Sequence, residues 1–248
     1  MRRYWVDDEC IVNDRFTLKG DTFHHIVDVC RMGKGDKFEI LNEKGTIFFV
    51  ELEDIAKKQA TGKILESRKA PEQKRPHFVL ALSVPRFNVF DATLEKCVEL
   101  GVSRIHPFTS DFSFIRNAKD LTPARTQRWD KIVKSASQQT GRADLLKIEA
   151  ITTLKQTVEE FNRKPRRLGL WAYEGEGELS LKEALSKAPR DLDEVWVFVG
   201  SEGGFSHQEI EIAKNSGFPP LTLGDQVLRV ETACVALISV IKYQLGTF

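Results

Sequence analysis

The sequence predicts an α/β protein with a small N-terminal β-barrel and a larger domain built on a mainly parallel sheet. Residues 1–70 contain short runs of β-forming residues between turn signals, which is typical of a small barrel. Residues 67–76 hold two prolines and no large apolar side chain, which indicates a linker. Strands and helices alternate after this linker, as they do in a parallel sheet that is covered by helices. We therefore expect a barrel domain at residues 1–70 and an α/β domain at residues 71–248.

The predicted elements of the barrel are short. One helix is expected near Thr22–Val29, and turn residues fill Gly33–Asp36 and Asn42–Gly45. Apolar and β-branched runs predict strands at residues 10–12, 38–41, 46–52 and 62–65.

The second domain shows the longer periods of helices between apolar strands. Pro123 after Thr122 predicts a helix start, and Ser206 with Glu209 forms a capping-box signal. Gly101, Gly141 and Gly217 follow predicted helix ends. The predicted strands are residues 78–82, 104–108, 167–172, 194–199 and 220–223, and the predicted helices are residues 88–100, 122–139, 153–161, 181–186, 206–217 and 230–245.

Composition excludes several classes of protein. Hydrophobic residues make up 41% of the chain and charged residues 29%, which excludes intrinsic disorder and fibrous folds. No apolar run approaches the roughly 20 residues of a membrane-spanning helix, and the N-terminus lacks the apolar stretch of a signal peptide. The four cysteines are far apart and join no histidine cluster, so we expect reduced thiols, no metal site and a cytoplasmic location.

Charge is unevenly distributed along the chain. The whole sequence carries 37 basic and 36 acidic residues, a net charge of +1. Residues 71–142, however, carry 12 basic and 7 acidic side chains. Such a local surplus fits a surface for a polyanion, although a solvated face of helices would give the same count.

A glycine-rich segment, Val199–Ser206, lies between a predicted strand and a predicted helix. Its glycines would let backbone N–H groups approach a ligand at the carboxyl end of the strand. The segment is neither a dinucleotide fingerprint nor a Walker loop, and the acidic Glu202 at its centre disfavours phosphate. A tight turn with structural glycines is the alternative.

A second strand-to-helix loop, Leu223–Cys234, carries charged residues at the mouth of the most apolar helix. Arg229 and Glu231 are two residues apart, which excludes an i,i+4 surface pair. Either these side chains form the rim of a pocket, or Glu231 or Thr232 caps the helix.

Five segments resemble motifs of the RsmE family, which are ribosomal RNA methyltransferases of the SPOUT superfamily. Gly200-Ser-Glu-Gly-Gly-Phe-Ser206 and Leu223–Ala233 resemble the two C-terminal motifs of this family. Residues 25–36, 95–107 and 138–142 resemble further motifs in the same order, so the resemblance covers nearly the whole chain.

The resemblance implies a PUA-like β-barrel followed by a SPOUT domain with a C-terminal trefoil knot. It also implies a homodimer that uses S-adenosyl-L-methionine to methylate N3 of a uridine in 16S rRNA of the small ribosomal subunit. Arg229 would stabilise charge on the base and Glu231 would accept the proton of N3. The cofactor-binding residues would be Gly200, Glu202, Gly203, Leu223, Gly224 and Leu228.

We assign RNA binding to the barrel and the basic middle third, and cofactor binding to the last third. The candidate phosphate contacts are Arg2, Arg3, Arg31, Lys34, Arg116, Arg125 and Arg142. For the homodimer we expect a contact through the final helix, whose apolar residues exceed what one helix face requires: Val230, Cys234, Leu237, Ile238 and Ile241.

Three departures from the family pattern leave rival functions open. Ser201 replaces the usual proline of the glycine loop, Gln226 replaces a basic residue, and the proline expected shortly after Arg142 is absent. The rivals are a SPOUT enzyme that acts on ribose 2′-OH or on transfer RNA, and an RNA-binding adaptor without activity. A dinucleotide-dependent oxidoreductase is disfavoured because its glycine fingerprint is absent.

Overall fold

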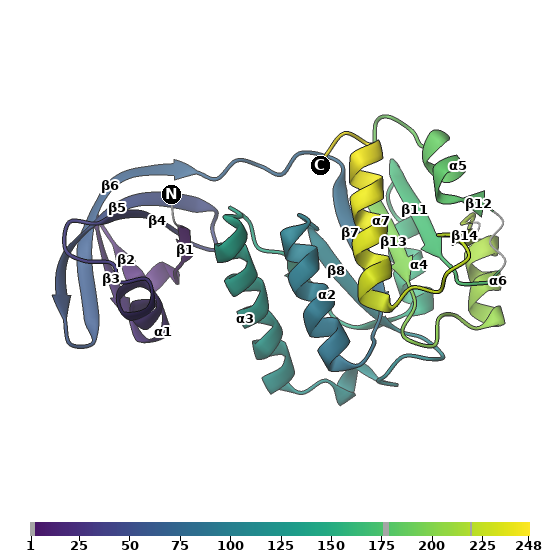
Figure 1. The fold of residues 1–248 in the computed structure, drawn as a ribbon, viewed down its shortest axis with the longest axis horizontal. Coiled ribbons are helices and arrows are strands. Elements are labelled where there is room, and N and C mark those ends of the chain that lie inside the picture. The colour runs from purple at the N-terminus through teal and green to yellow at the C-terminus, as the bar shows by residue number, and fades with distance from the viewer. Residues whose placement is uncertain (1–2, 176–178, 219) are drawn as a thin grey trace. The chain divides into compact units, whose positions relative to one another are not determined.

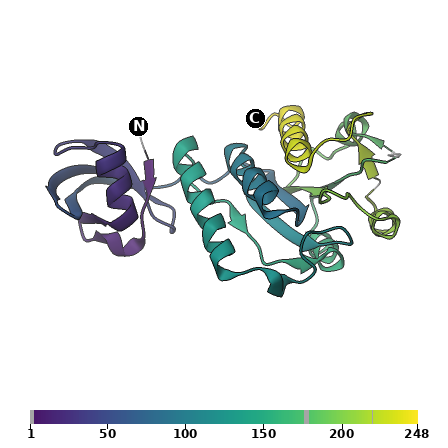
Figure 2. The ribbon, with the colours of Figure 1, turned by 60° about the horizontal axis from the view of Figure 1, so that its bottom comes forward.

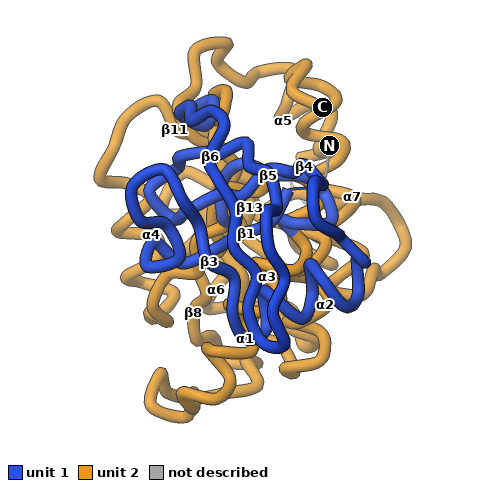
Figure 3. Tube along the Cα trace, turned by 90° about the vertical axis from the view of Figure 1, so that its left-hand side faces the viewer, with its two compact units in different colours: residues 1–72, 137–145 blue, residues 73–136, 146–248 orange. Residues whose placement is uncertain are grey.

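The computed structural model describes residues 3–175, 179–218 and 220–248 (Figure 1). The chain divides into two units, which Figure 3 shows in different colours. The first unit comprises residues 1–72 and 137–145, and the second comprises residues 73–136 and 146–248.

The first unit is built on a six-stranded sheet in the order β1-β4-β5-β6-β3-β2. All neighbours in this sheet pair antiparallel except β1 and β4, which pair parallel. The register between β5 and β6 shifts at two points, and such bulges bend the strands. The strands are β1 (Arg3–Trp5), β2 (Ile11–Val12), β3 (Arg15–Lys19), β4 (Lys37–Leu41), β5 (Thr46–Ala56) and β6 (Gln59–Lys69).

The core of the first unit is made by inward residues of its strands, among them Phe16, Phe38 and Val50, all of which are buried. The helix predicted near Thr22–Val29 is present as α1 (Gly20–Phe23), which continues into the π-helical segment η2 (His24–Val29). The four predicted strands are also present. Strands β1 and β3 were not predicted, and Cys10 ends the 3₁₀ turn η1 (Asp8–Cys10) instead of starting a strand.

The second unit contains a parallel sheet in the order β10-β8-β7-β13-β11-β14-β12, with β9 also paired to β8. The five strands predicted for this unit are confirmed, and most of their apolar residues are buried between the helices on either side. The strands are β7 (His77–Ser83), β8 (Arg104–Thr109), β9 (Lys147–Ile148), β10 (Thr152–Thr153), β11 (Arg167–Ala172), β12 (Leu179–Ser180), β13 (Glu194–Val199) and β14 (Pro220–Thr222).

Helices cover both faces of this sheet. Figures 1 and 2 show α2 and α7 side by side, and α7 packs against both α2 and β13. Rings of β13 and β11, such as Trp196 and Trp171, pack with Phe161 of α4 and with residues of α6. The helices that begin in this unit are α2 (Phe87–Glu99), η3 (Ala118–Asp120), α3 (Pro123–Thr140), α4 (Leu154–Asn162), α5 (Leu181–Ser186), α6 (His207–Asn215) and α7 (Val230–Gln244), and α3 ends in the first unit.

The apolar residues of α7 do not supply the argument for a dimer contact, and that contact stays a prediction. The five apolar residues that were expected to form a dimer contact are buried within their own chain, because α7 lies against α2 and β13 at once: Val230, Cys234, Leu237, Ile238 and Ile241. The exposed large apolar residues of α7 are Val240 and Tyr243 instead.

Candidate active site

The glycine-rich loop connects β13 to α6, as predicted. Its end is fixed by the predicted capping box, in which the backbone N–H of Ser206 donates to the Glu209 carboxylate at 2.9 Å. The hydroxyl of Ser206 also donates to Asp111 Oδ2 at 2.5 Å, and the N–H of Asp111 donates to Glu209 Oε1 at 2.9 Å. These bonds hold the loop against the segment that follows β8.

Two glycines make the tight turn of this loop possible. The N–H of Gly204 donates to the carbonyl of Ser201 at 2.9 Å, and Gly204 has a φ of +67°, which side chains disfavour. A Cβ at Gly200 would lie 2.8 Å from backbone atoms of Gly204. The tight-turn interpretation is therefore correct as a description of the loop, and it does not exclude a ligand beside the turn.

The second loop connects β14 to α7. Gly224 has a φ of +120°, and its N–H donates to the Thr222 hydroxyl at 3.2 Å, which reverses the chain after the strand. Arg229 is the residue that precedes the first helical turn, and no side chain caps the helix. Neither Glu231 nor Thr232 is thus the cap that the alternative interpretation requires. Glu231 lies in the first turn, where the helix dipole favours a negative charge.

The two loops and the end of β11 line a pocket that is partly open to solvent. Four predicted cofactor residues line this pocket: Gly200, Leu223, Gly224 and Leu228. The other lining residues are mostly apolar or small, and they include one carboxylate but no lysine or arginine: Ala172, Tyr173, Glu174, Val199, Ser201, Gly204, Phe205, Thr222, Gln226, Val227, Val230 and Ala233.

Glu202 and Gly203 are not among the residues that line this pocket. Glu202 lines a neighbouring pocket, and a Cβ at Gly203 would meet the Cβ of Phe112 at 2.8 Å. A side chain at Gly203 would therefore displace Phe112 before it reached the first pocket. The assignment of Glu202 and Gly203 to cofactor binding stays a prediction.

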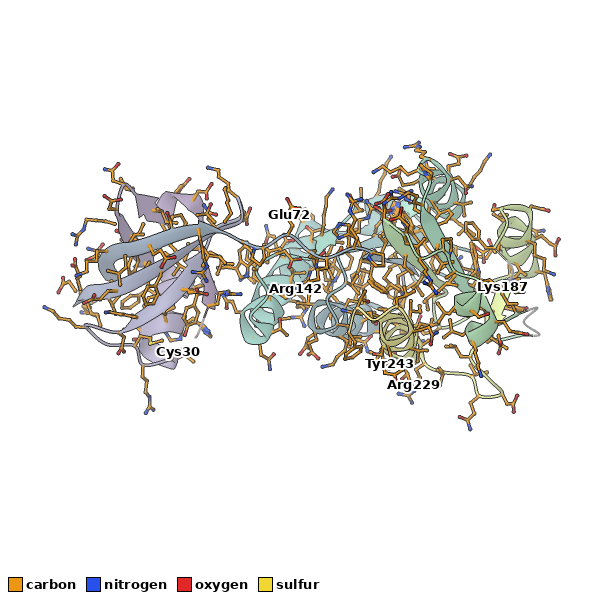
Figure 4. The ribbon with its side chains drawn as sticks, turned by 90° about the horizontal axis from the view of Figure 1, so that it is seen from above. Cys30, Glu72, Arg142, Lys187, Arg229 and Tyr243 are labelled. Atoms are coloured by element: carbon orange, nitrogen blue, oxygen red, sulfur yellow. The ribbon has the colours of Figure 1, made fainter. Side chains whose placement is uncertain are left out.

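The neighbouring pocket brings together the two predicted catalytic residues. Arg229 and Glu231 both line it, and Figure 4 shows Arg229 on the exposed side of the chain at the start of α7. The pocket is open to solvent, and it shares Glu174, Ser201, Val227, Leu228 and Val230 with the first pocket. The two pockets therefore adjoin.

Sequence reasoning missed three polar residues of this second pocket: Arg86, Asn88 and Glu174. Arg86 immediately precedes α2, and its backbone N–H donates to Glu202 Oε1 at 3.0 Å. Arg86 and Glu174 follow β7 and β11, so their positions at the carboxyl ends of strands were the available signal. The second pocket thus combines two guanidinium groups with the carboxylates of Glu174, Glu202 and Glu231.

Five predicted RNA contacts fall in the first unit, four of them among the described residues, and the side chains of Arg3 and Arg142 are bonded to other residues of that unit. Arg3 donates to the buried Glu39 at 2.9 Å and to the carbonyl of Gly141 at 2.5 Å. Burial raises the pKa of Glu39, but hydrogen bonds from Arg68 and Arg3 outweigh that effect and lower it. The side chain of Arg142 is 9% exposed and donates to Asp144 at 2.5 Å.

Arg31 and Lys34, in contrast, are exposed near the end of the helical segment of the first unit. Arg31 has a positive φ of 56°, so the chain turns sharply at this point. Arg2 lies outside the described residues.

In the second unit, Arg116 is exposed and its guanidinium donates to the carbonyl of Asp111. Arg125 is partly buried. It donates to Asp91 Oδ2 at 3.3 Å, and its guanidinium carbon lies 4.4 Å from the centre of the Phe87 ring. The RNA-binding assignments of these residues stay predictions.

The described ranges contain neither a metal-binding cluster nor a membrane-spanning helix. No group of three or more His, Cys, Asp or Glu residues within them could hold a metal ion. Within those ranges no helix has the length and apolar character that crossing a membrane requires.

Comparison with protein families decides the family. The model described as RNA methyltransferase domain matches residues 71–242, and the model described as RNA methyltransferase PUA domain matches residues 18–65. The chain belongs to the RNA methyltransferase family. The predicted fold class, a PUA-like domain followed by an α/β methyltransferase domain, is thereby confirmed.

Individual relatives agree with the resemblance to the RsmE family. Ribosomal RNA small subunit methyltransferase E of Buchnera aphidicola (Acyrthosiphon pisum) is 27% identical over 99% of this chain and 94% of its own length. The protein of the same name from Bacillus subtilis is 26% identical over 98% of this chain and 97% of its own.

Two solved structures share the fold of this chain. The ribosomal RNA small subunit methyltransferase E of Neisseria gonorrhoeae, solved with S-adenosylmethionine bound, has a TM-score of 0.81 and 26% identity over 98% of this chain and 97% of its own. A Legionella pneumophila protein in complex with the same cofactor has a TM-score of 0.83 and 25% identity, with 97% and 96% of the chains covered.

Proposed function

We propose that this protein transfers a methyl group from S-adenosyl-L-methionine to N3 of a uridine in 16S rRNA. The observation that carries the proposal is the pair of adjoining pockets at the carboxyl ends of β11, β13 and β14. One pocket suits a cationic cofactor, and the other holds the charged residues that a base would need. Membership of the family and the names of its relatives support the same reaction.

The first pocket fits the chemistry of the cofactor. Gly200 and Gly204 let the loop close tightly beside this pocket, because a Cβ at Gly200 would lie 2.8 Å from the backbone of Gly204 and one at Gly204 would lie 2.5 Å from Glu174 Oε1. Phe205, Val199 and Val230 offer apolar surface to an adenine ring. Glu174 is the charged residue of the lining, and its carboxylate suits a ligand that carries a sulfonium and an ammonium group. When bound, the cofactor supplies an electrophilic methyl carbon.

The second pocket would hold the uracil. N3 carries a proton on the Watson–Crick edge of the base, so the uridine must be unpaired or turned out to react. The guanidinium of Arg229 would stabilise the negative charge that spreads over the base when N3 loses this proton. Glu231 would accept the proton, and N3 then forms its bond to the methyl carbon as the carbon–sulfur bond breaks.

The remaining assignments belong to the same proposal. The first unit would bind RNA through its exposed Arg31 and Lys34, and a homodimer would form with the face of α7 that exposes Val240 (48%) and Tyr243 (80%). Figure 4 shows Tyr243 on the outside of this helix. The resemblance to the RsmE family implies the trefoil knot, and the four separated cysteines favour a cytoplasmic location.

The test is the identity of the methylated nucleoside. The full chain is incubated with S-adenosylmethionine and either 16S rRNA or small ribosomal subunits that lack the modification, and the digested RNA is analysed by mass spectrometry. We expect 3-methyluridine. A 2′-O-methylated nucleoside, or methylation of transfer RNA alone, would instead favour another SPOUT enzyme. No binding of S-adenosylmethionine in calorimetry would favour the adaptor without activity.

A further inference from the structure

The segment that follows β8, residues 110–116, holds two phenylalanine side chains out into solvent. Phe112 is 49% exposed and Phe114 is 51% exposed. Isolated exposed apolar residues are common on protein surfaces. Here two large rings project from positions two residues apart, with the buried Ser113 between them.

The exposure of these rings is not due to a loose loop. The N–H of Phe114 donates to the carbonyl of Val84 at 2.8 Å, and the Ser201 hydroxyl donates to the carbonyl of Phe112 at 2.6 Å. The buried Ser113 hydroxyl lies 2.8 Å from the carbonyl of Ser110 and 2.7 Å from that of Ile115, so it links the two ends of the segment. The backbone of both phenylalanines is therefore fixed, and the rings are presented in advance of any binding.

Neither ring lines the second pocket, but each contacts a chain neighbour of a residue that does. The Cβ of Phe112 lies against Gly203, the neighbour of Glu202. The ring of Phe114 meets the ring of Phe87 edge to face at 5.2 Å, and Phe87 follows Arg86. Glu202 and Arg86 both line the second pocket and are hydrogen-bonded to each other. We call Phe112 and Phe114 the aromatic rim.

We propose that the aromatic rim stacks unpaired bases of the RNA on either side of the target uridine. This inference rests on the proposed function, because a uridine that is methylated at N3 must lie in an unpaired stretch, whose neighbouring bases expose their flat faces. Aromatic side chains bind such faces with little regard to sequence.

Two exposed arginines near the aromatic rim, beside the carboxylates of Asp111 and Glu202, suit RNA better than an apolar protein surface. The exposed Arg116 is held in the same segment by its bond to the carbonyl of Asp111, and the exposed Arg86 lies next to Phe87. Aromatic rings interleaved with guanidinium groups match the alternation of bases and phosphates along a single strand.

The experiment compares full-length variants that either remove or keep the aromatic ring at each position. Phe112→Leu and Phe114→Leu keep apolar bulk but remove the ring, whereas Phe112→Tyr and Phe114→Tyr keep it. Phe248→Leu is the matched control, because Phe248 is 78% exposed in the same unit and contacts neither pocket. The measurements are the KM for 16S rRNA, the Kd for a short fluorescent single-stranded oligouridylate, the Kd for S-adenosylmethionine, and the mass in solution.

We expect each leucine variant to raise the KM for rRNA and the Kd for oligouridylate by about 5- to 150-fold. The tyrosine variants and Phe248→Leu should stay near the wild type, and the Kd for S-adenosylmethionine should not change. Leucine variants with unchanged RNA affinity would overturn the inference. So would leucine variants that lose RNA affinity only because their mass in solution falls, since the rim would then be a contact between copies.

The two proposals fail in distinguishable ways. If the wild-type protein binds oligouridylate through the aromatic rim but methylates no uridine in 16S rRNA, the proposed function fails and the RNA surface stands. If it methylates 16S rRNA and the leucine variants do so with unchanged KM, the proposed function stands and the surface fails.

Discussion

The backbone N–H of Arg86 donates to the carboxylate of Glu202 at 3.0 Å, which joins the start of α2 to the tip of the glycine-rich loop. Arg86 follows β7 and Glu202 follows β13, and these strands are neighbours in the sheet. The bond therefore closes one wall of the second pocket from two segments that are 116 residues apart. The carboxylate of Glu202 therefore has a hydrogen-bond partner within the protein, and a cationic ligand is not needed to explain its place in the loop.

Glu202→Ala should affect substrate more than cofactor. The variant loses the acceptor of the Arg86 N–H at the start of α2, which we expect to cost about 1 kcal/mol of stability, as for loss of a helix cap. The KM for rRNA should rise several-fold, while the Kd for S-adenosylmethionine should stay within about twofold. Glu202→Gln keeps an acceptor oxygen and serves as the control for charge. Calorimetry and steady-state kinetics give both constants, and a larger loss in cofactor affinity would return Glu202 to the cofactor site.

Gly200→Ala should abolish cofactor binding. Its Cβ would lie 2.8 Å from the backbone of Gly204, so the turn would have to open and the pocket wall would move. Gly33→Ala is the matched control, since the nearest atom to its Cβ would be Asp36 Oδ2 at 3.9 Å. Calorimetry with S-adenosylmethionine should show no binding by Gly200→Ala and normal binding by Gly33→Ala. Circular dichroism checks that both variants fold, and normal affinity in Gly200→Ala would remove this loop from the site.

Local signals in the sequence predicted most elements, because they depend on near neighbours. The capping box of Ser206 and Glu209 and the apolar run of β13 are complete within a few residues. Local signals could not assign Arg86 and Glu174 to the site. The order of β7, β13 and β11 in the sheet decides which strand ends meet, and that order depends on distant residues. The knot of the SPOUT domain likewise stays a prediction, since true knots are rare and no periodicity indicates one.

The sequence also could not predict which charged and apolar side chains are buried within their own unit. Counting charges cannot separate a surface arginine from one such as Arg142, whose side chain is packed inside its unit and bonded to Asp144. Nor can hydrophobic content tell whether the apolar residues of α7 face a second copy or, as in Leu237 and Ile241, the core of their own unit. Both questions depend on tertiary contacts that a single sequence does not contain.

His106 should make the protein less stable in mild acid. Its ring is 7% exposed, neither ring nitrogen has a hydrogen-bond partner within the described residues, and the ring meets Trp196 edge to face at 5.5 Å. Burial, and secondarily the charge of Arg104, lowers the pKa of His106 below 6.5. The unfolded chain therefore binds a proton at this histidine more tightly than the folded chain does. The stabilising contribution of the neutral ring is complete above the unfolded pKa and is lost as pH falls from about 6.5 toward the folded pKa.

His106→Phe should remove this part of the pH dependence. The variant should be at least as stable as the wild type at pH 8, because an unpartnered buried polar group costs about 1–3 kcal/mol. Its advantage should grow as pH falls from about 7 to about 5. Urea unfolding at several pH values measures this difference, with His207→Phe, an exposed histidine of the same unit, as control. An advantage that does not change with pH would show that His106 has an ordinary pKa.

Arg229→Ala should slow methylation without weakening cofactor binding. Arg229 lines the second pocket but not the first, so its loss removes a donor to the charge on the uracil and leaves the wall of the first pocket intact. Loss of one such donor lowers kcat by about 10²- to 10³-fold in comparable sites. Single-turnover methylation of 16S rRNA and calorimetry with S-adenosylmethionine give the two values. Arg128→Ala, at an exposed arginine of α3 that pairs with Asp91, is the control for a general loss of positive charge.

Glu231→Gln should lower the rate by about 10²- to 10⁴-fold, the range for a general base, and raised pH should restore part of it. The restoration follows because N3 of the uracil loses its proton without help when the solution is sufficiently alkaline. Glu231 caps no helix end through its side chain, so the glutamine variant should fold normally and bind S-adenosylmethionine normally. Glu174→Gln is the informative comparison, since Glu174 lines both pockets and its loss should weaken cofactor binding as well. The measurement is the pH–rate profile of each variant under single turnover. Two results together would assign the role of proton acceptor to Glu174 instead. The rate of Glu231→Gln would match the wild type at every pH, and the rate of Glu174→Gln would no longer depend on an ionised group.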